Sequence, residues 1–147
     1  MARTFKQGFF KPKNPSKYKG SCKEIVYRSS YELKFMLWCD NHPDVIYWNS
    51  EGVIIPYLSP KDEKLHRYFV DFLVKIKSIH NEEKVYLIEI KPYVQTIPPK
   101  QTKNRKRMIQ ETVTYEVNQA KWKAAKRWCD DRKIEFKIMT EKELNIR

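Results

Sequence analysis

Residues 68–93, YFVDFLVKIKSIHNEEKVYLIEIKPY, decide the fold, because they set charged residues inside two apolar runs. The runs cover residues 68–76 and 84–90 and are rich in Val, Ile, Phe and Tyr, with a short polar segment between them. This pattern predicts two antiparallel strands joined by a short loop. Asp71 interrupts the first run, and Glu89 interrupts the second.

If the hairpin turns near His80, Asp71 lies about opposite Glu89. Two carboxylates side by side among apolar residues repel each other and lose hydration, and a divalent cation would offset both costs. Hard oxygen ligands suit Mg²⁺ or Mn²⁺. Lys91 is two residues beyond Glu89 and shares its face, so it could meet a phosphate oxygen or an attacking water. The alternative is a surface salt bridge between Lys91 and a carboxylate.

The composition predicts a partner with many negative charges. The chain has 147 residues, with 30 Lys and Arg against 18 Asp and Glu, which leaves a net charge of +12. DNA, RNA and an anionic membrane surface all fit that charge. Because no apolar run approaches the roughly 20 residues that span a bilayer, and residues 1–13 do not resemble a secretion signal, we expect a cytosolic protein without a membrane partner. Three cysteines without a CxxC pair indicate reduced thiols.

We expect one domain over residues 1–147, made of a basic arm (1–23) and a core (24–147). The arm carries basic and aromatic residues and no acidic one. It is either a solvated tail or an arm on the DNA backbone. A second basic segment, residues 94–108, follows Lys91 directly. It is either a loop or loop-to-helix segment that grips phosphate, or a solvated charge run. The candidate DNA contacts in the two segments are Lys11, Lys13, Lys17, Lys19, Lys100, Lys103, Arg105, Lys106 and Arg107.

The remaining periodicity predicts helices over residues 28–41 and 111–131, and strands over 44–48, 53–58 and 134–139. In the first helix Glu32 lies at the edge of an apolar face with Phe35, Met36 and Cys39. Ser29 and Glu32 also fit a capping box, in which Glu32 bonds back to the start of the helix.

For the second helix we predict a core-facing stripe of Val117, Ala120, Ala124 and Trp128, with Tyr115, Trp122, Ala125 and Cys129 beside it. The element order is helix, four strands, helix, strand. It predicts an α/β fold with a mixed central sheet flanked by helices.

The pattern Val70-Asp71, followed by Glu89-Ile90-Lys91 on the next strand, resembles the PD-(D/E)XK nucleases. Val70 replaces the Pro that is usual in that family. The resemblance implies a restriction-endonuclease-like αβββαβ core and a Mg²⁺-dependent or Mn²⁺-dependent deoxyribonuclease. It further implies that Asp71, Glu89 and the Ile90 carbonyl hold the metal.

The same resemblance gives roles to residues on both helices. Glu32, on the first helix, would supply a further metal contact, which is compatible with its capping role. Lys91 would act on the attacking water or the phosphate. Gln119 or Lys123, on the second helix, would contact the DNA near the scissile phosphate.

The segments MARTFKQGFFKPKNPSKY, YRSSYE and FVDFLV…YLIEIKP are similar to the head-completion nucleases of T4-like tailed phages, which are related to transposon end-cutting nucleases. This resemblance implies trimming of packaged double-stranded DNA in the host cytoplasm, near portal or neck proteins, before heads join tails. Two alternatives are a non-catalytic DNA-binding joining protein on the same fold and a dimeric junction resolvase. Trp38 and Trp48 could form a dimer interface if they are exposed.

Overall fold

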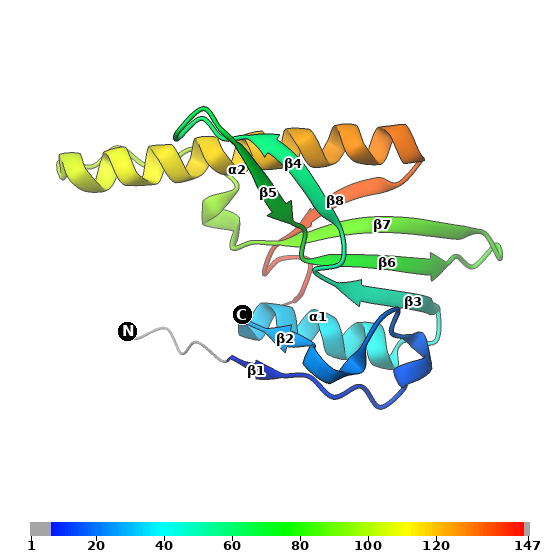
Figure 1. Cartoon of the computed structure of the whole chain (residues 1–147). Helices are drawn as coiled ribbons and strands as arrows, with labels where there is room; N and C mark the ends of the chain where they lie inside the picture. Colours follow the sequence, from blue (N-terminus) through cyan, green and yellow to red (C-terminus); the bar gives the residue numbers. More distant parts are fainter. Residues whose placement is uncertain (1–6, 146–147) are drawn as a thin grey trace.

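The computed structural model describes residues 7–145, and its centre is a four-stranded sheet between two helices (Figure 1). The strands lie in the order β3 (Val45–Ser50), β6 (Phe72–Lys77), β7 (Glu83–Ile90) and β8 (Glu135–Met139). β8 is parallel to β7, and the other neighbours are antiparallel. α1 (Ser30–Asn41) covers one face and α2 (Arg105–Arg132) the other. The predicted α/β fold with a mixed sheet is confirmed.

Two smaller sheets complete the described chain. β4 (Ile54–Leu58) and β5 (Leu65–Phe69) form an antiparallel ribbon that reaches towards α2 (Figure 1). β1 (Gly8–Phe9) pairs with β2 (Val26–Tyr27) beside α1. Short 3₁₀ turns lie at η1 (Pro15–Lys17), η2 (Cys22–Glu24) and η3 (Tyr93–Gln95). Pro56 lies in β4, and this strand pairs with β5 alone, as suits a residue that has no backbone N–H to donate.

Alternation along β6 and β7 divides the core into two parts, because successive side chains of a strand point to opposite faces. Phe72, Val74 and Ile88 pack with α1. Leu73 and Leu87 pack on the other side, with α2 and the β4–β5 ribbon. Glu89 follows Leu87 by two residues, so it points into the α2 side of the sheet.

The run 68–76 is not one strand, which corrects the sequence prediction. Residues up to Phe69 belong to the ribbon, and the central sheet starts at Phe72. Between them the Val70 N–H donates to the Val53 carbonyl, 3.1 Å away, and the Asp71 carbonyl accepts from the Glu51 N–H at 3.0 Å. The chain therefore passes from one sheet to another at Asp71.

α2 is longer than predicted and turns a different stripe to the core. It begins at Arg105, six residues before the expected start, and the Asn104 side chain accepts from the Arg107 N–H at 3.1 Å. The most buried residues are Asn118, Trp122, Ala125 and Cys129. The predicted stripe of Val117, Ala120, Ala124 and Trp128 is only partly buried beside them.

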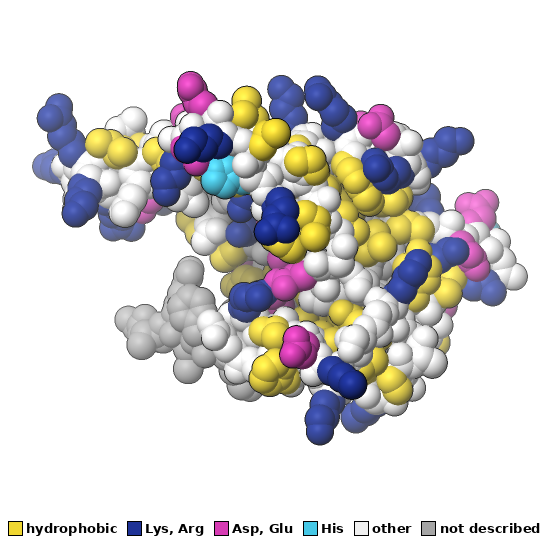
Figure 2. Space-filling view, in the orientation of Figure 1, with side chains coloured by type: hydrophobic (Ala, Val, Ile, Leu, Met, Phe, Trp, Pro, Cys, Tyr) yellow, Lys and Arg dark blue, Asp and Glu magenta, His cyan; other side chains and the backbone are white. Residues whose placement is uncertain are grey.

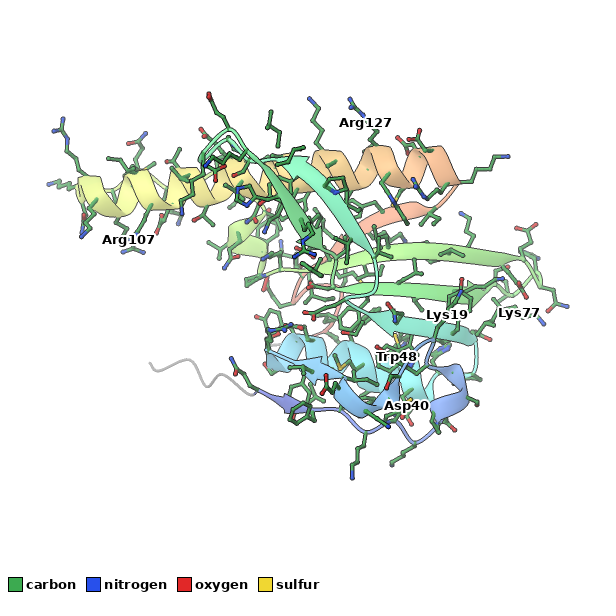
Figure 3. The ribbon with its side chains drawn as sticks, in the orientation of Figure 1. Lys19, Asp40, Trp48, Lys77, Arg107 and Arg127 are labelled. Atoms are coloured by element: carbon green, nitrogen blue, oxygen red, sulfur yellow. The ribbon has the colours of Figure 1, made fainter. Side chains whose placement is uncertain are left out.

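The described part of the N-terminal segment is docked on the body, while residues 1–6 lie outside the described residues. Asp40, at the end of α1, is buried, and its carboxylate accepts from the backbone N–H groups of Lys13 (2.8 Å) and Asn14 (3.0 Å). Figure 3 shows Asp40 beside this segment. Two ring contacts add to the docking, because Trp48 meets Phe10 and Tyr18 at centroid distances of 5.7 and 4.7 Å.

Trp48 is fully buried, so it cannot belong to a dimer interface, whereas Trp38 is 40% exposed. Cys22, Cys39 and Cys129 are free thiols, as predicted. Within residues 7–145 no helix has the length and apolar character needed to cross a bilayer.

Candidate active site

The two carboxylates of the hairpin meet where β6 begins and β7 ends. The register pairs Phe72 with Ile88, and one step further it sets Asp71 across from Glu89, as predicted for a turn near His80. The Asp71 carboxylate accepts a hydrogen bond from the Ile90 backbone N–H at 2.8 Å. This bond fixes the side chain at the point where the chain enters the sheet.

The surroundings of Asp71 favour its neutral form. Burial raises the pKa of the Asp71 carboxyl well above its ordinary value, and the negative charge of Glu89 raises it further. The Ile90 N–H lowers that pKa but does not cancel the rise, and the charge of Glu32 adds to it. A group that binds between these carboxylates and brings positive charge would remove this repulsion.

Glu89 is 4% exposed, and its Oε1 atom has no hydrogen-bond partner among the described residues. Its Oε2 atom lies 4.0 Å from Lys91 Nζ, so both side chains share a face as predicted. A buried carboxylate oxygen without a partner is costly. The pair of Asp71 and Glu89 therefore fits a divalent cation that prefers oxygen ligands.

Glu32 approaches this pair from the first turn of α1. Its backbone N–H donates to Ser29 Oγ at 3.1 Å, and the Ser29 hydroxyl donates to Glu32 Oε2 at 3.2 Å, so Ser29 caps the helix. Burial raises the pKa of the Glu32 carboxyl. Among the described residues, no three His, Cys, Asp or Glu side chains gather closely enough to form a complete metal site. The predicted Glu32 contact thus stays a prediction, as does that of the Ile90 carbonyl.

Sequence reasoning missed three residues on the α2 side of the carboxylates. Tyr68 is buried on the ribbon and Trp122 on α2. The Tyr68 hydroxyl adjoins the Glu89 carboxylate without reaching hydrogen-bond geometry; burial first, and then the Glu89 charge, raise the pKa of Tyr68. Lys121 Nζ lies 5.5 Å from the centroid of the Tyr68 ring. No sequence motif marked these residues.

The structure places Gln119 and Lys123 elsewhere on α2. Both side chains are exposed. Gln119 lines a hollow formed with the far end of the ribbon, beside Leu58 and Ser59. On this helix it is Lys121, between them in sequence, whose pKa responds to the charges of Glu89 and Asp71.

The predicted DNA-binding residues lie on several surfaces. Lys11, Lys13 and Lys19 are exposed. Lys17 is occupied at the end of α1, where its Nζ donates to the carbonyls of Asp40 (3.2 Å) and His42 (2.6 Å). Lys19 Nζ lies 4.7 Å from the centroid of the Tyr47 ring. Figure 3 shows Lys19 on the same side of the molecule as Lys77, the last residue of β6. Lys19 is therefore near the end of the sheet opposite Asp71.

The second basic segment runs from a connection into a helix, which is the second of the two forms expected for it. Lys100 and Lys103 are exposed in the connection before α2, whereas Arg105, Lys106 and Arg107 form the first turn of the helix. This half of α2 extends past the sheet, with Arg107 near its end (Figure 3). In the space-filling view, acidic side chains occupy the middle of the face and basic side chains lie around them (Figure 2).

Comparison with known proteins agrees with this geometry. The family model "TnsA-like endonuclease N terminal" matches residues 42–141, which contain Asp71, Glu89 and Lys91. The chain is also 42% identical over 139 residues to the head completion nuclease of Enterobacteria phage T4, covering 91% of this chain and 90% of that protein. The chain therefore belongs to the TnsA-like endonuclease family and is a nuclease.

Proposed function

We propose that the protein is a divalent-metal-dependent deoxyribonuclease whose centre is formed by Asp71, Glu89 and Lys91. The unpartnered Oε1 atom of Glu89, buried beside a second carboxylate, carries this proposal. Asp71 and Glu89 would hold Mg²⁺ or Mn²⁺, with Glu32 and the Ile90 carbonyl completing the ligand set. When bound, such a cation polarises a phosphodiester and lowers the pKa of a bound water.

The side chains of the centre have separate tasks in this proposal. Asp71 is held by the Ile90 N–H, and Glu89 is held by burial, so neither carboxylate has to reorganise on binding. Lys91, half-buried and 4.0 Å from Glu89, orients or deprotonates the attacking water, or stabilises charge on the phosphate. We expect products with 5′-phosphate and 3′-hydroxyl ends, from endonucleolytic cutting and from exonucleolytic trimming.

We further propose a substrate and a setting. The net charge of +12 and the exposed basic side chains favour double-stranded DNA. A relative with 42% identity is named as a head completion nuclease of a phage. By that likeness the protein would trim packaged DNA in the host cytoplasm during head completion, beside portal or neck proteins.

The proposal is tested with the purified protein on supercoiled and linear plasmid in Mg²⁺, Mn²⁺ or EDTA. Cleavage is expected with either metal and not in EDTA, and ligation of the products checks their ends. Binding without cleavage in all three conditions would show instead a non-catalytic joining protein. Cleavage confined to branched DNA, by a protein that sediments as a dimer, would favour a junction resolvase.

The basic first turn of α2 should act on binding rather than on chemistry. It lies roughly 20 Å along the helix from Asn118, at 1.5 Å per residue, so it would touch DNA away from the cut. Changing Arg105, Lys106 and Arg107 together to Gln should reduce the slope of log affinity against log salt by up to about 3, since each lost phosphate contact removes about 0.9.

Fluorescence anisotropy with a labelled duplex at several salt concentrations measures this slope. The control replaces Arg127, Arg132 and Lys133, which are exposed at the other end of α2, with Gln. Equal slopes for wild type and the first-turn variant would show that this turn does not touch DNA.

A further inference from the structure

We propose that Lys121 is a second lysine of the nuclease centre and that its ammonium contacts the scissile phosphodiester. The inference rests on the proposed function and adds a residue from α2, whereas the sequence motif draws its groups from the sheet. Lys121 lies on α2 beside two tyrosine rings of the ribbon, and Tyr68, one of the two, adjoins the Glu89 carboxylate.

The first observation is the way that Lys121 is held. Its Nζ lies 5.5 Å from the centroid of the Tyr68 ring and 5.8 Å from that of Tyr57. The two rings are edge to face, 6.4 Å apart, on the inner side of the ribbon. Contact with ring faces stabilises an ammonium and limits its positions. The rings therefore aim a cation without neutralising its charge.

The second observation is the set of charges around it. Burial lowers the pKa of Lys121, the positive charge of Lys91 lowers it further, and the charges of Glu89 and Asp71 oppose this fall. Lys121 and Lys91 thus share one electrostatic environment with both carboxylates. The two lysines would meet a bound phosphate from different elements, one from α2 and one from the end of β7.

The third observation is what Lys121 does not contact. Within residues 7–145, no carboxylate lies within ion-pair distance of its ammonium, in contrast to Lys75, which pairs with Glu83 at 2.9 Å. A half-buried ammonium without a hydrogen-bond acceptor is costly, because its hydration is reduced and not replaced. A phosphate oxygen would supply that acceptor. An ammonium that points at the oxygen on which negative charge develops would act mainly in the transition state.

The test compares Lys121→Met with Lys121→Arg and with Lys126→Met, an exposed lysine on the same helix. Met keeps the aliphatic contact with the rings, Arg keeps the charge, and Lys126→Met removes one charge from an exposed position of α2. Single-turnover cleavage of a labelled duplex in Mg²⁺ gives a rate constant at saturation and, separately, the half-saturating protein concentration.

We expect Lys121→Met to reduce the saturated rate about a hundredfold or more, as for the loss of one charge-stabilising donor. The half-saturating concentration should change by less than about threefold, since many other phosphate contacts remain. Lys121→Arg should recover at least part of the rate, and Lys126→Met should match wild type. A purely structural lysine would lower the unfolding midpoint and leave the rate of the folded fraction unchanged.

Two outcomes would overturn the inference in different ways. If wild type cleaves and Lys121→Met cleaves within about twofold of it, Lys121 does not touch the reacting phosphate, and the proposed function stands. If wild type cleaves no duplex in Mg²⁺ or Mn²⁺, the proposed function and this inference both fail. Unfolding midpoints for all variants identify any loss of rate that comes from a loss of fold. If Lys121→Met is unfolded, the Lys121→Arg variant decides. A folded Lys121→Arg protein that cleaves about a hundredfold more slowly than wild type contradicts a role carried by charge alone.

Discussion

Replacing Asp71 with Asn is expected to abolish cleavage and at the same time to stabilise the protein. The amide can still accept the hydrogen bond from the Ile90 N–H, so the local structure should persist. The charge is lost, and with it the binding of the cation, so the cleavage rate should fall by about a thousandfold or more. Stability should rise because one of two repelling carboxylates has gone.

The raised pKa of Asp71 sets how the stability gain of Asp71→Asn depends on pH. Because the pKa of Asp71 is raised in the folded state, that state binds more protons than the unfolded chain between the two pKa values. The wild type is therefore penalised progressively as pH rises from the ordinary Asp range, near 4. Asn removes this penalty, so its gain should grow as the pH rises from the ordinary Asp range towards the raised pKa, and should vanish below that range.

Urea unfolding in EDTA measures this gain, which we expect to be on the order of 1 kcal/mol at pH 7.5. Glu82→Gln, an exposed carboxylate in the hairpin turn, is the matched control and should have little effect. Added Mg²⁺ should stabilise the wild type and not Asp71→Asn, because a ligand that binds only the folded state adds to its stability. A variant that is less stable than wild type at neutral pH would contradict the repulsion inferred here.

Replacing Trp48 with Ala is expected to cause the largest loss of stability, about 3–5 kcal/mol. The indole is fully buried and touches Phe10, Tyr18 and Phe72, so it joins the N-terminal segment to the central sheet. Its backbone carbonyl also accepts from the Lys19 N–H at 2.8 Å. Loss of the ring would leave a cavity and release the docked segment.

Equilibrium unfolding in urea measures this change, and limited proteolysis of the N-terminal segment reports its release. Trp38→Ala removes the same side chain from an exposed site on α1 and should cost about 1 kcal/mol or less. Equal losses for the two variants would mean that the contacts of Trp48 do not hold the N-terminal segment and the sheet together.

The hairpin could be predicted from sequence for two reasons. A charged residue inside an apolar strand is rare, and the side chains of a strand alternate between its two faces with a fixed period of two residues. Asp71 and Glu89 stood out for that reason, and their register followed from the position of the turn. The change of sheet at Asp71 could not be predicted. Residues 68–76 read as one apolar run although their two halves pair with different strands, and only the ribbon's contact with α2 separates them.

The side chains that α2 places near the carboxylates could not be predicted from the sequence, for a related reason. Two neighbouring apolar stripes on α2 differ by one residue, or about 100° around the helix, and the buried one contains the polar Asn118. The sequence therefore favoured the wrong stripe, and no motif marked Lys121. The start of α2 was predicted six residues too late, because Arg and Lys at the beginning of a helix oppose its dipole.

The single-turnover cleavage rate of Glu89→Gln in Mg²⁺ tests the central claim most directly. Glu83→Gln is its matched control, since Glu83 begins the same strand β7 but is exposed and paired with Lys75 at 2.9 Å. The account predicts at least about a thousandfold loss for Glu89→Gln and a rate close to wild type for Glu83→Gln, with both proteins still binding DNA. Cleavage by Glu89→Gln at the wild-type rate would contradict the claim that the buried carboxylate pair is the nuclease centre.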